Sequence, residues 1–140
     1  MKNLMLILVL LTPILGMREV FRCDEPKGVG MWSNENHRPT ADGFKGVQPL
    51  VVIEGKDMTV TWGGTKLNPG SREKVWKAAV FHRSSESVSG VALDSEPGVG
   101  AAAMLYTVDT KRGYLYMSTH KNSEVIGIST ASTYVSKCAK

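Results

Sequence analysis

Three side chains in one stretch of the sequence have the chemistry to hold a ligand. Trp32, His37 and Arg38 lie between residues 31 and 46, in a polar segment that proline and glycine interrupt. An indole stacks on flat ligands, and an imidazole and a guanidinium donate hydrogen bonds. Long loops of compact domains tend to carry function, so we predict that this loop makes the ligand contacts. The alternative for Trp32 is a ring that folds back as a plug over the core.

No pattern in the sequence predicts catalysis. There is no G-x-S-x-G turn to present a serine nucleophile, and Asp94 and Glu96 lie beside proline and glycine as ordinary loop acids. Residues 98–103 match the G-x-G-x-x-A dinucleotide pattern, but a hairpin pattern follows instead of a crossover helix. The histidines lack the spacing of metal ligands. We predict a protein that is not an enzyme, with no catalytic, cofactor-binding or metal-binding residues.

The first 16 residues predict an export signal. Lys2 precedes an apolar run that ends near the small residue Gly16, and the run is too short to span a bilayer. We therefore expect residues 17–140 to form the mature protein, a single β-rich domain that is periplasmic or extracellular and has no stable membrane anchor.

The chain contains two cysteines, Cys23 and Cys138, close to the two ends of the mature chain. Because an exported chain meets an oxidising compartment, we predict a disulfide between them. Such a bond requires the first and last strands to be neighbours. Two buried free thiols are the alternative.

The charges are scattered along the chain. Seventeen lysines and arginines and 13 acidic residues give a net charge of +4 over 140 residues. A nucleic-acid-binding protein would concentrate its basic residues on one face, so we exclude that function and expect a monomer whose partner is a protein, a glycan or a small ligand.

Two predicted hairpins set the architecture that must position these residues. In residues 104–119, a turn over Lys111 and Arg112 with Gly113 left-handed places Val108 opposite Tyr116 and Tyr106 opposite Ser118. In residues 50–62, a two-residue II′ turn at Gly55 and Lys56 makes one apolar face, formed by Val51, Ile53, Met58, Val60 and Trp62.

The other segments add further short strands. Residues 18–23, 75–83, 88–94 and 124–138 have strand patterns, the last with a bend at Gly127, although residues 72–82 also fit a short helix behind a Ser71 cap. We predict an all-β fold, an antiparallel meander of seven or eight short strands that closes into a small barrel. A two-sheet β-sandwich is the alternative.

The segment Val20-Phe21-Arg22-Cys23-Asp24, the final cysteine and the eight-strand pattern together resemble the small exported lysozyme-inhibitor barrels of bacteria. The resemblance implies the architecture alone. Where that family is expected to carry a Ser-Gly-x-x-Tyr loop, residues 89–93 end in Leu93, so no functional residue is carried over.

We predict a small exported binding or inhibitor module that presents loops on a disulfide-closed β-scaffold. The alternative is a structural or assembly component of an envelope or particle, in which the last strand is an exposed edge that pairs with another chain. A hydrolase is the least favoured function.

Overall fold

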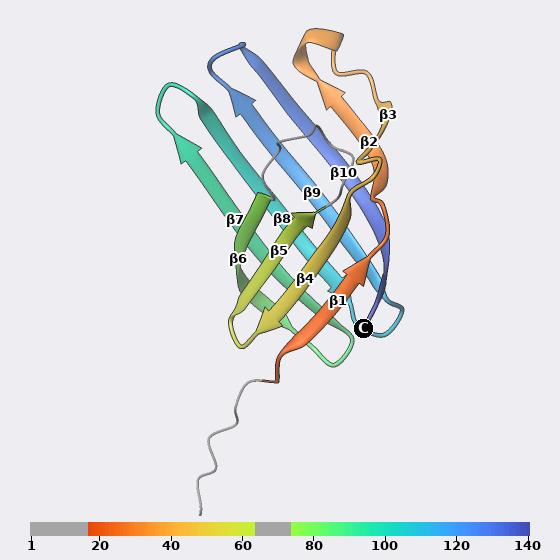
Figure 1. The fold of residues 1–140 in the computed structure, drawn as a ribbon. Coiled ribbons are helices and arrows are strands. Elements are labelled where there is room, and N and C mark those ends of the chain that lie inside the picture. Colours follow the sequence, from red (N-terminus) through yellow and green to blue (C-terminus); the bar gives the residue numbers. More distant parts are fainter. Residues whose placement is uncertain (1–16, 64–73) are drawn as a thin grey trace, which may run out of the picture.

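The fold is all-β. The computed structural model describes residues 17–63 and 74–140, so the predicted export signal lies outside the described residues. The strands, with one short 3-10 helix η1 (Ser33–Glu35), are shown in Figure 1. They are β1 (Glu19–Cys23), β2 (Lys27–Trp32), β3 (Thr40–Gly43), β4 (Gln48–Glu54), β5 (Asp57–Gly63), β6 (Lys74–Arg83), β7 (Ser87–Glu96), β8 (Gly100–Asp109), β9 (Tyr114–Ser123) and β10 (Ile128–Ala139). Among these residues no helix has the length and apolar character needed to cross a bilayer.

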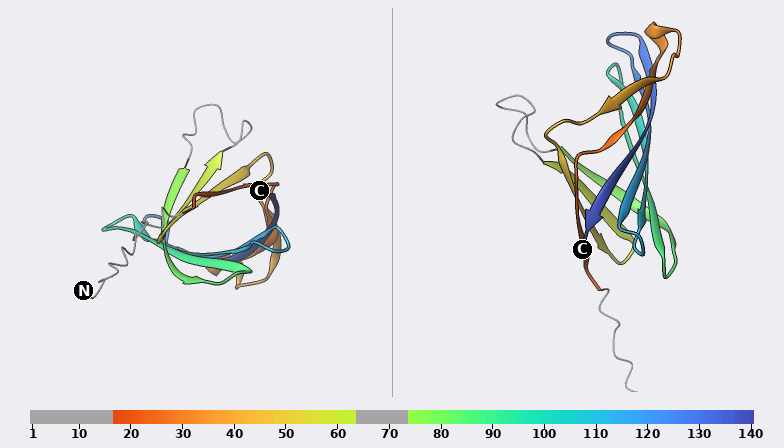
Figure 2. Two further views of the ribbon diagram at one scale, coloured as in Figure 1. Left: turned by 90° about the horizontal axis from the view of Figure 1, so that it is seen from below. Right: turned by 90° about the vertical axis from the view of Figure 1, so that its right-hand side faces the viewer.

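Eight of the strands close into an antiparallel barrel, which confirms the predicted fold class. The order is β1-β4-β5-β6-β7-β8-β9-β10, and β10 pairs with β1 again. Seen along the barrel, the strands encircle the interior (Figure 2). Side chains alternate across each strand, so one half of them fills this interior.

The two additional strands make one end of the barrel open. β2 continues from β1 along β10, with Lys27 opposite Val135, and β3 pairs with the outer side of β2. Hairpins β2–β3, β7–β8 and β9–β10 extend beyond β4 and β5 (Figure 1). The upper half is therefore an open, curved sheet.

The prediction of a long loop over residues 31–46 is wrong in part, because β2 continues to Trp32 and β3 occupies Thr40–Gly43. The run Gly28-Val29-Gly30 has the composition of a strand breaker, yet it lies in β2. A Cβ at Gly28 would lie 1.8 Å from the carbonyl oxygen of Thr133, so glycine is what lets β2 approach β10. Pairing with a distant strand overrides local propensity here.

The β8–β9 hairpin forms, but its predicted register is wrong by one residue. Val108 faces Leu115 and Tyr106 faces Met117. The carboxylate of Asp109 accepts hydrogen bonds from the N–H groups of Lys111 (3.1 Å) and Arg112 (2.7 Å), which enlarges the turn to residues 110–113. Gly113 is left-handed as predicted, with φ 72°. The corrected register places the buried apolar side chains of the two strands on one face.

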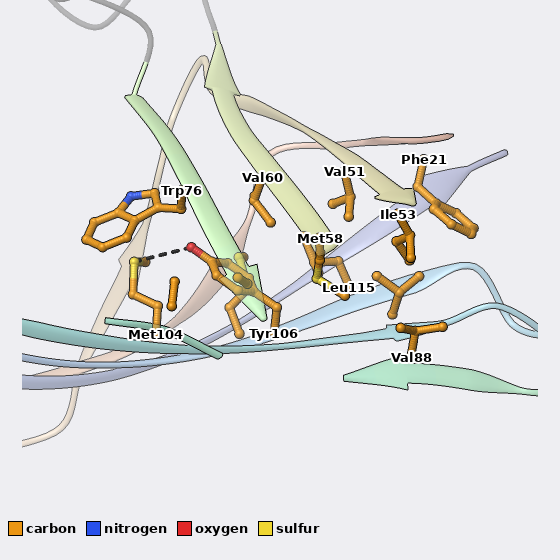
Figure 3. Packing of buried hydrophobic residues seen from close by; sticks show 14 of the residues in the cluster. Phe21, Val51, Ile53, Met58, Val60, Trp76, Val88, Met104, Tyr106 and Leu115 are labelled. Carbon is orange, nitrogen blue, oxygen red and sulfur yellow. Dashed lines mark hydrogen bonds between the residues drawn. The ribbon is translucent and has the colours of Figure 1, made fainter. Parts of the chain in front are cut away.

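The β4–β5 hairpin has the predicted register. Val51 faces Val60, Ile53 faces Met58, and Gly55 has φ 60° at the turn. All four side chains are fully buried, and Trp62 packs against the same core. Trp76 and Met104 lie at one end of the labelled cluster and Phe21 at the other (Figure 3).

The remaining segments are mostly as predicted. Residues 74–83 form a strand and not the alternative helix, whose proposed Ser71 cap lies outside the described residues. Residues 87–96 form the predicted strand in lengthened form. Residues 124–127 turn between β9 and β10, with Gly127 at φ 63°, so the last strand begins only at Ile128.

A disulfide joins Cys23 to Cys138, as predicted. The two residues are directly opposite each other where β1 pairs with β10, so the terminal strands are neighbours. The bond is consistent with an oxidising, exported location.

The alternation in β5 predicts opposite outcomes for adjacent substitutions. Val60→Asp buries an unpaired carboxylate in the core and should lower the free energy of unfolding by more than about 4 kcal/mol, or prevent folding. Thr59 points outward between Val52 and Lys77, so Thr59→Asp should lower it by about 1 kcal/mol or less. Urea denaturation measures both, and equal damage would contradict the observed register.

The disulfide predicts a second outcome. Mass spectrometry of non-reduced peptides from exported protein should find Cys23 linked to Cys138, and reduction should lower the free energy of unfolding by up to about 4–5 kcal/mol. Both thiols free in exported material would contradict it.

Candidate ligand-binding site at the open end of the barrel

A row of facing side chains crosses the inner, concave face of the open sheet. Lys121 in β9 pairs with Ala102 on one side and with Thr130 on the other, and the row continues to Asp94 and Trp32. All five residues lie on the same face of the sheet as the residues that fill the barrel interior, because residues two positions apart along a strand share a face. Distant parts of the chain thus supply one surface above the core.

This surface encloses a hollow of about 410 Å³, which we call the inner hollow. Its size lies within the range of small-molecule sites. Apolar side chains dominate, while Lys121, Asp94 and Glu96 supply charge. The lining consists of Trp32, Asp94, Glu96, Val99, Gly100, Ala101, Ala102, Lys121, Asn122, Ser123, Ile126, Ile128 and Thr130.

The next row towards the barrel consists of small residues except for Met104, which lies between Ala92 and Thr119. Ala92, Thr119 and Ser132 have short, buried side chains, and Gly30 has none. A Cβ on Gly30 would lie 2.4 Å from the end of the Trp32 indole, so this ring folds back across Gly30. Trp32 is half-buried and forms one wall of the inner hollow.

Aromatic rings pack at the same end of the interior. The ring of Phe44 lies 4.9 Å from those of both Trp62 and Tyr134, centroid to centroid. Tyr106 is fully buried, donates a hydrogen bond to the Met104 sulfur at 3.2 Å, and has a pKa that burial raises well above its ordinary range. The buried Nε1 of Trp62 forms no hydrogen bond of ordinary geometry among the described residues, although the indole lies close enough to the Tyr106 hydroxyl to affect its pKa.

Charged groups meet above the rings. Burial and the neighbouring Lys74 ammonium lower the pKa of Lys121, and Asp42 partly offsets this. The Lys74 ammonium lies 4.5 Å from the centre of the Trp76 ring. The Asp42 carboxylate is already engaged, since it accepts hydrogen bonds from the Tyr134 hydroxyl and, at 2.8 Å, from the Gly43 N–H.

A second hollow lies on the outer face of the same sheet. This outer hollow, of about 600 Å³, is lined mainly by small side chains of the opposite strand phase, such as Ala103 and Ala131, with His120 and the exposed Leu93. It is the larger of the two hollows and, like the inner one, it is mainly apolar.

The structure separates the three residues that the sequence grouped. Trp32 lines the inner hollow, His37 the outer one, and the exposed Arg38 lines neither. They cannot contact one small ligand in the inner hollow together. The sequence analysis did not identify Lys121, Asp42 and Tyr134. Each is a charged or hydroxyl-bearing residue at a position where the strand points inward and its neighbours are mostly apolar. This could be recognised only once the strand register was known.

No group of three His, Cys, Asp or Glu side chains in residues 17–63 and 74–140 is placed to hold a metal ion. Residues 98–103 form the β7–β8 turn and the start of β8, so they do not open a helix as a dinucleotide-binding segment does. The chemistry that remains at the open end is stacking, apolar contact and charge pairing.

The Tyr134–Asp42 contact predicts a loss of stability at alkaline pH. Burial, with the Asp42 carboxylate, raises the pKa of Tyr134 from 10.0 to about 12. Between these values the unfolded chain ionises first, so this contribution to stability is complete below pH 10 and lost as pH approaches about 12. Urea denaturation should show a steeper decline over this range for wild type than for Tyr134→Phe. The half-exposed Tyr116→Phe is the control, and parallel curves for wild type and Tyr134→Phe would contradict the assignment.

Comparisons with known proteins do not supply a family for this chain. No protein-family model matches it, and no curated protein matches it. The case for a function rests on the chemistry of the open end of the barrel.

Proposed function

We propose that the protein is a small exported binding module that holds a largely apolar small ligand in the inner hollow. The observation that carries the proposal is the hollow itself: it is mainly apolar and lies on the inner face of the sheet whose strands continue from the barrel wall. Sites in the mouths of β-barrels have this character. The export signal and the disulfide support the exported location.

The proposal moves the ligand contacts from a loop to strands. Ala102, Lys121 and Thr130 belong to three adjacent strands, and only the Trp32 side chain comes from the end of β2. Contacts built on a sheet hold a fixed spacing, which suits a small molecule of defined shape. The folded-back indole supplies a flat, apolar wall for that molecule.

A matched pair of substitutions on β8 tests the proposal. Ala102 points into the inner hollow and Ala103 points to the outer face, so Ala102→Trp fills the hollow and Ala103→Trp does not. The uncharged dye phenylnaphthylamine brightens in apolar surroundings and serves as the probe. We expect saturable binding to wild type and to Ala103→Trp, and at least about tenfold weaker binding to Ala102→Trp.

Two results would contradict the proposal. One is a wild-type protein that does not bind the dye at micromolar concentration. The other is equal binding by both variants, which would place the dye elsewhere. Urea denaturation of both variants shows whether they are folded.

The second candidate, an assembly component, now depends on a different surface. β10 lies between β9 on one side and β1 and β2 on the other, so the last strand is not an exposed edge as predicted. The outer face of the open sheet instead exposes several large apolar side chains, an arrangement found at association surfaces. They are Val29, Leu93, Leu105, Tyr116 and Val135.

Size-exclusion chromatography distinguishes the two candidates. An assembly component should elute as an oligomer at micromolar concentration, and Leu93→Lys should shift it towards the monomer. A wild-type monomer under the same conditions contradicts this second candidate and leaves the binding module.

A further inference from the structure

The inner hollow also specifies the charge of its ligand, an inference that rests on the proposed function. We infer that the ligand carries one anionic group, such as a carboxylate or sulfonate, on an aromatic or otherwise apolar body, and that Lys121 holds this group with the charge of Lys74 nearby. The anion sits at the junction between the hollow and the ring cluster, and the apolar body lies against Trp32 and Ile128.

Lys121 has a central position on the inner face of the open sheet. It is the central residue of the row that crosses the inner face, with Ala102 and Thr130 as direct neighbours. Both neighbours are short, which leaves space beside the lysine. Its side chain is exposed to solvent and lines the hollow, so an incoming ligand can reach it.

Neither Lys121 nor Lys74 forms an ion pair with another described residue. In the part of the chain that the structure describes, no carboxylate oxygen lies within 4.0 Å of the Lys121 or Lys74 ammonium. Asp42 is the acid that acts on Lys121, but the Tyr134 hydroxyl and the Gly43 N–H already occupy it. Asp94 lies two strands from Lys121, about 10 Å away between Cα atoms.

Lys74 is the positively charged residue that acts on Lys121. Lys74 starts β6, on the wall that faces the open sheet, and its ammonium lies over the Trp76 ring. The two like charges repel, and together with partial burial this lowers the pKa of Lys121. An anion beside Lys121 would offset the repulsion from Lys74.

The remaining charges limit the ligand to one anionic group. Asp94 and Glu96 stand at the β7 edge of the hollow, exposed to solvent, and would repel a second anion there. Between this edge and Lys121 the wall is apolar or small, and Ile126, Ile128 and Val99 complete it. A molecule that is apolar apart from one anionic end matches this distribution.

Two dyes with the same ring skeleton separate charge from apolar contact. Anilinonaphthalene sulfonate differs from phenylnaphthylamine essentially by its sulfonate group. We expect Lys121→Met to weaken binding of the sulfonate dye by about tenfold, the effect of losing one charge-assisted contact, and to change binding of the neutral dye by less than about twofold. Lys74→Met should act in the same direction.

Two further variants control for packing and for general charge. Lys121→Arg keeps the cation and should bind the sulfonate dye within about threefold of wild type. Lys77→Met removes an exposed lysine from the opposite face of β6 and should change neither dye. Retained binding of the neutral dye shows that each variant is folded with its hollow intact.

The outcomes separate this inference from the proposed function. Unchanged sulfonate binding by Lys121→Met, with the neutral dye still blocked by Ala102→Trp, would overturn the anionic ligand and leave the binding site. Equal losses of both dyes in Lys121→Met would also overturn it, because the lysine would then act by packing. No neutral-dye binding by wild type would overturn the proposed function itself.

Discussion

The structure depends on the seam where β1 joins β10. Every other neighbouring pair of barrel strands shares a longer ladder, but β1 and β10 pair only at Arg22–Ala139 and Cys23–Cys138. Two residue pairs supply little hydrogen bonding to close a barrel of eight strands. The disulfide lies within this short ladder, so a covalent bond holds the seam where noncovalent pairing is weakest. Closure in turn gives the inner side chains a common interior.

The same short seam makes the open end possible. β1 leaves β10 after Cys23, and β2 takes its place along the upper part of β10. The sheet then continues through β3 instead of returning to β4, so the upper strands curve without closing. Side chains on the inner face of the strands therefore pack into the core in the closed part of the barrel and face open space at the open end. The hollow is a direct result of that change in pairing.

The site places charged side chains at inward-facing strand positions, which are usually apolar in a barrel core. Lys121 has the strand phase of the buried Leu115 and Met117, where a charge would be unfavourable. It is tolerated because Lys121 lies at the open end, where the residue is exposed to solvent. Asp42 is tolerated because Tyr134 and a backbone N–H satisfy its carboxylate. Burial and the neighbouring Lys74 lower the pKa of Lys121, and perturbed pKa values concentrate at functional sites.

Much of the fold follows from local pattern in the sequence. The β4–β5 hairpin was predictable with its register because Gly55 permits a tight turn and apolar residues alternate on both arms. The spacing of strands and turns predicted the barrel, and two cysteines at the two ends of the predicted mature chain predicted the bond between its terminal strands.

Tertiary structure decided what local pattern leaves open. The β8–β9 register depends on a carboxylate, Asp109, that binds the turn backbone and adds a residue to the loop. β2 forms in a glycine-rich run because β10 passes too close for side chains. The site was not readable from sequence, since Asp42, Lys74 and Lys121 meet only after a long-range ladder sets which face each one shares. Strand pairing between distant segments carries that information, and local propensity does not contain it.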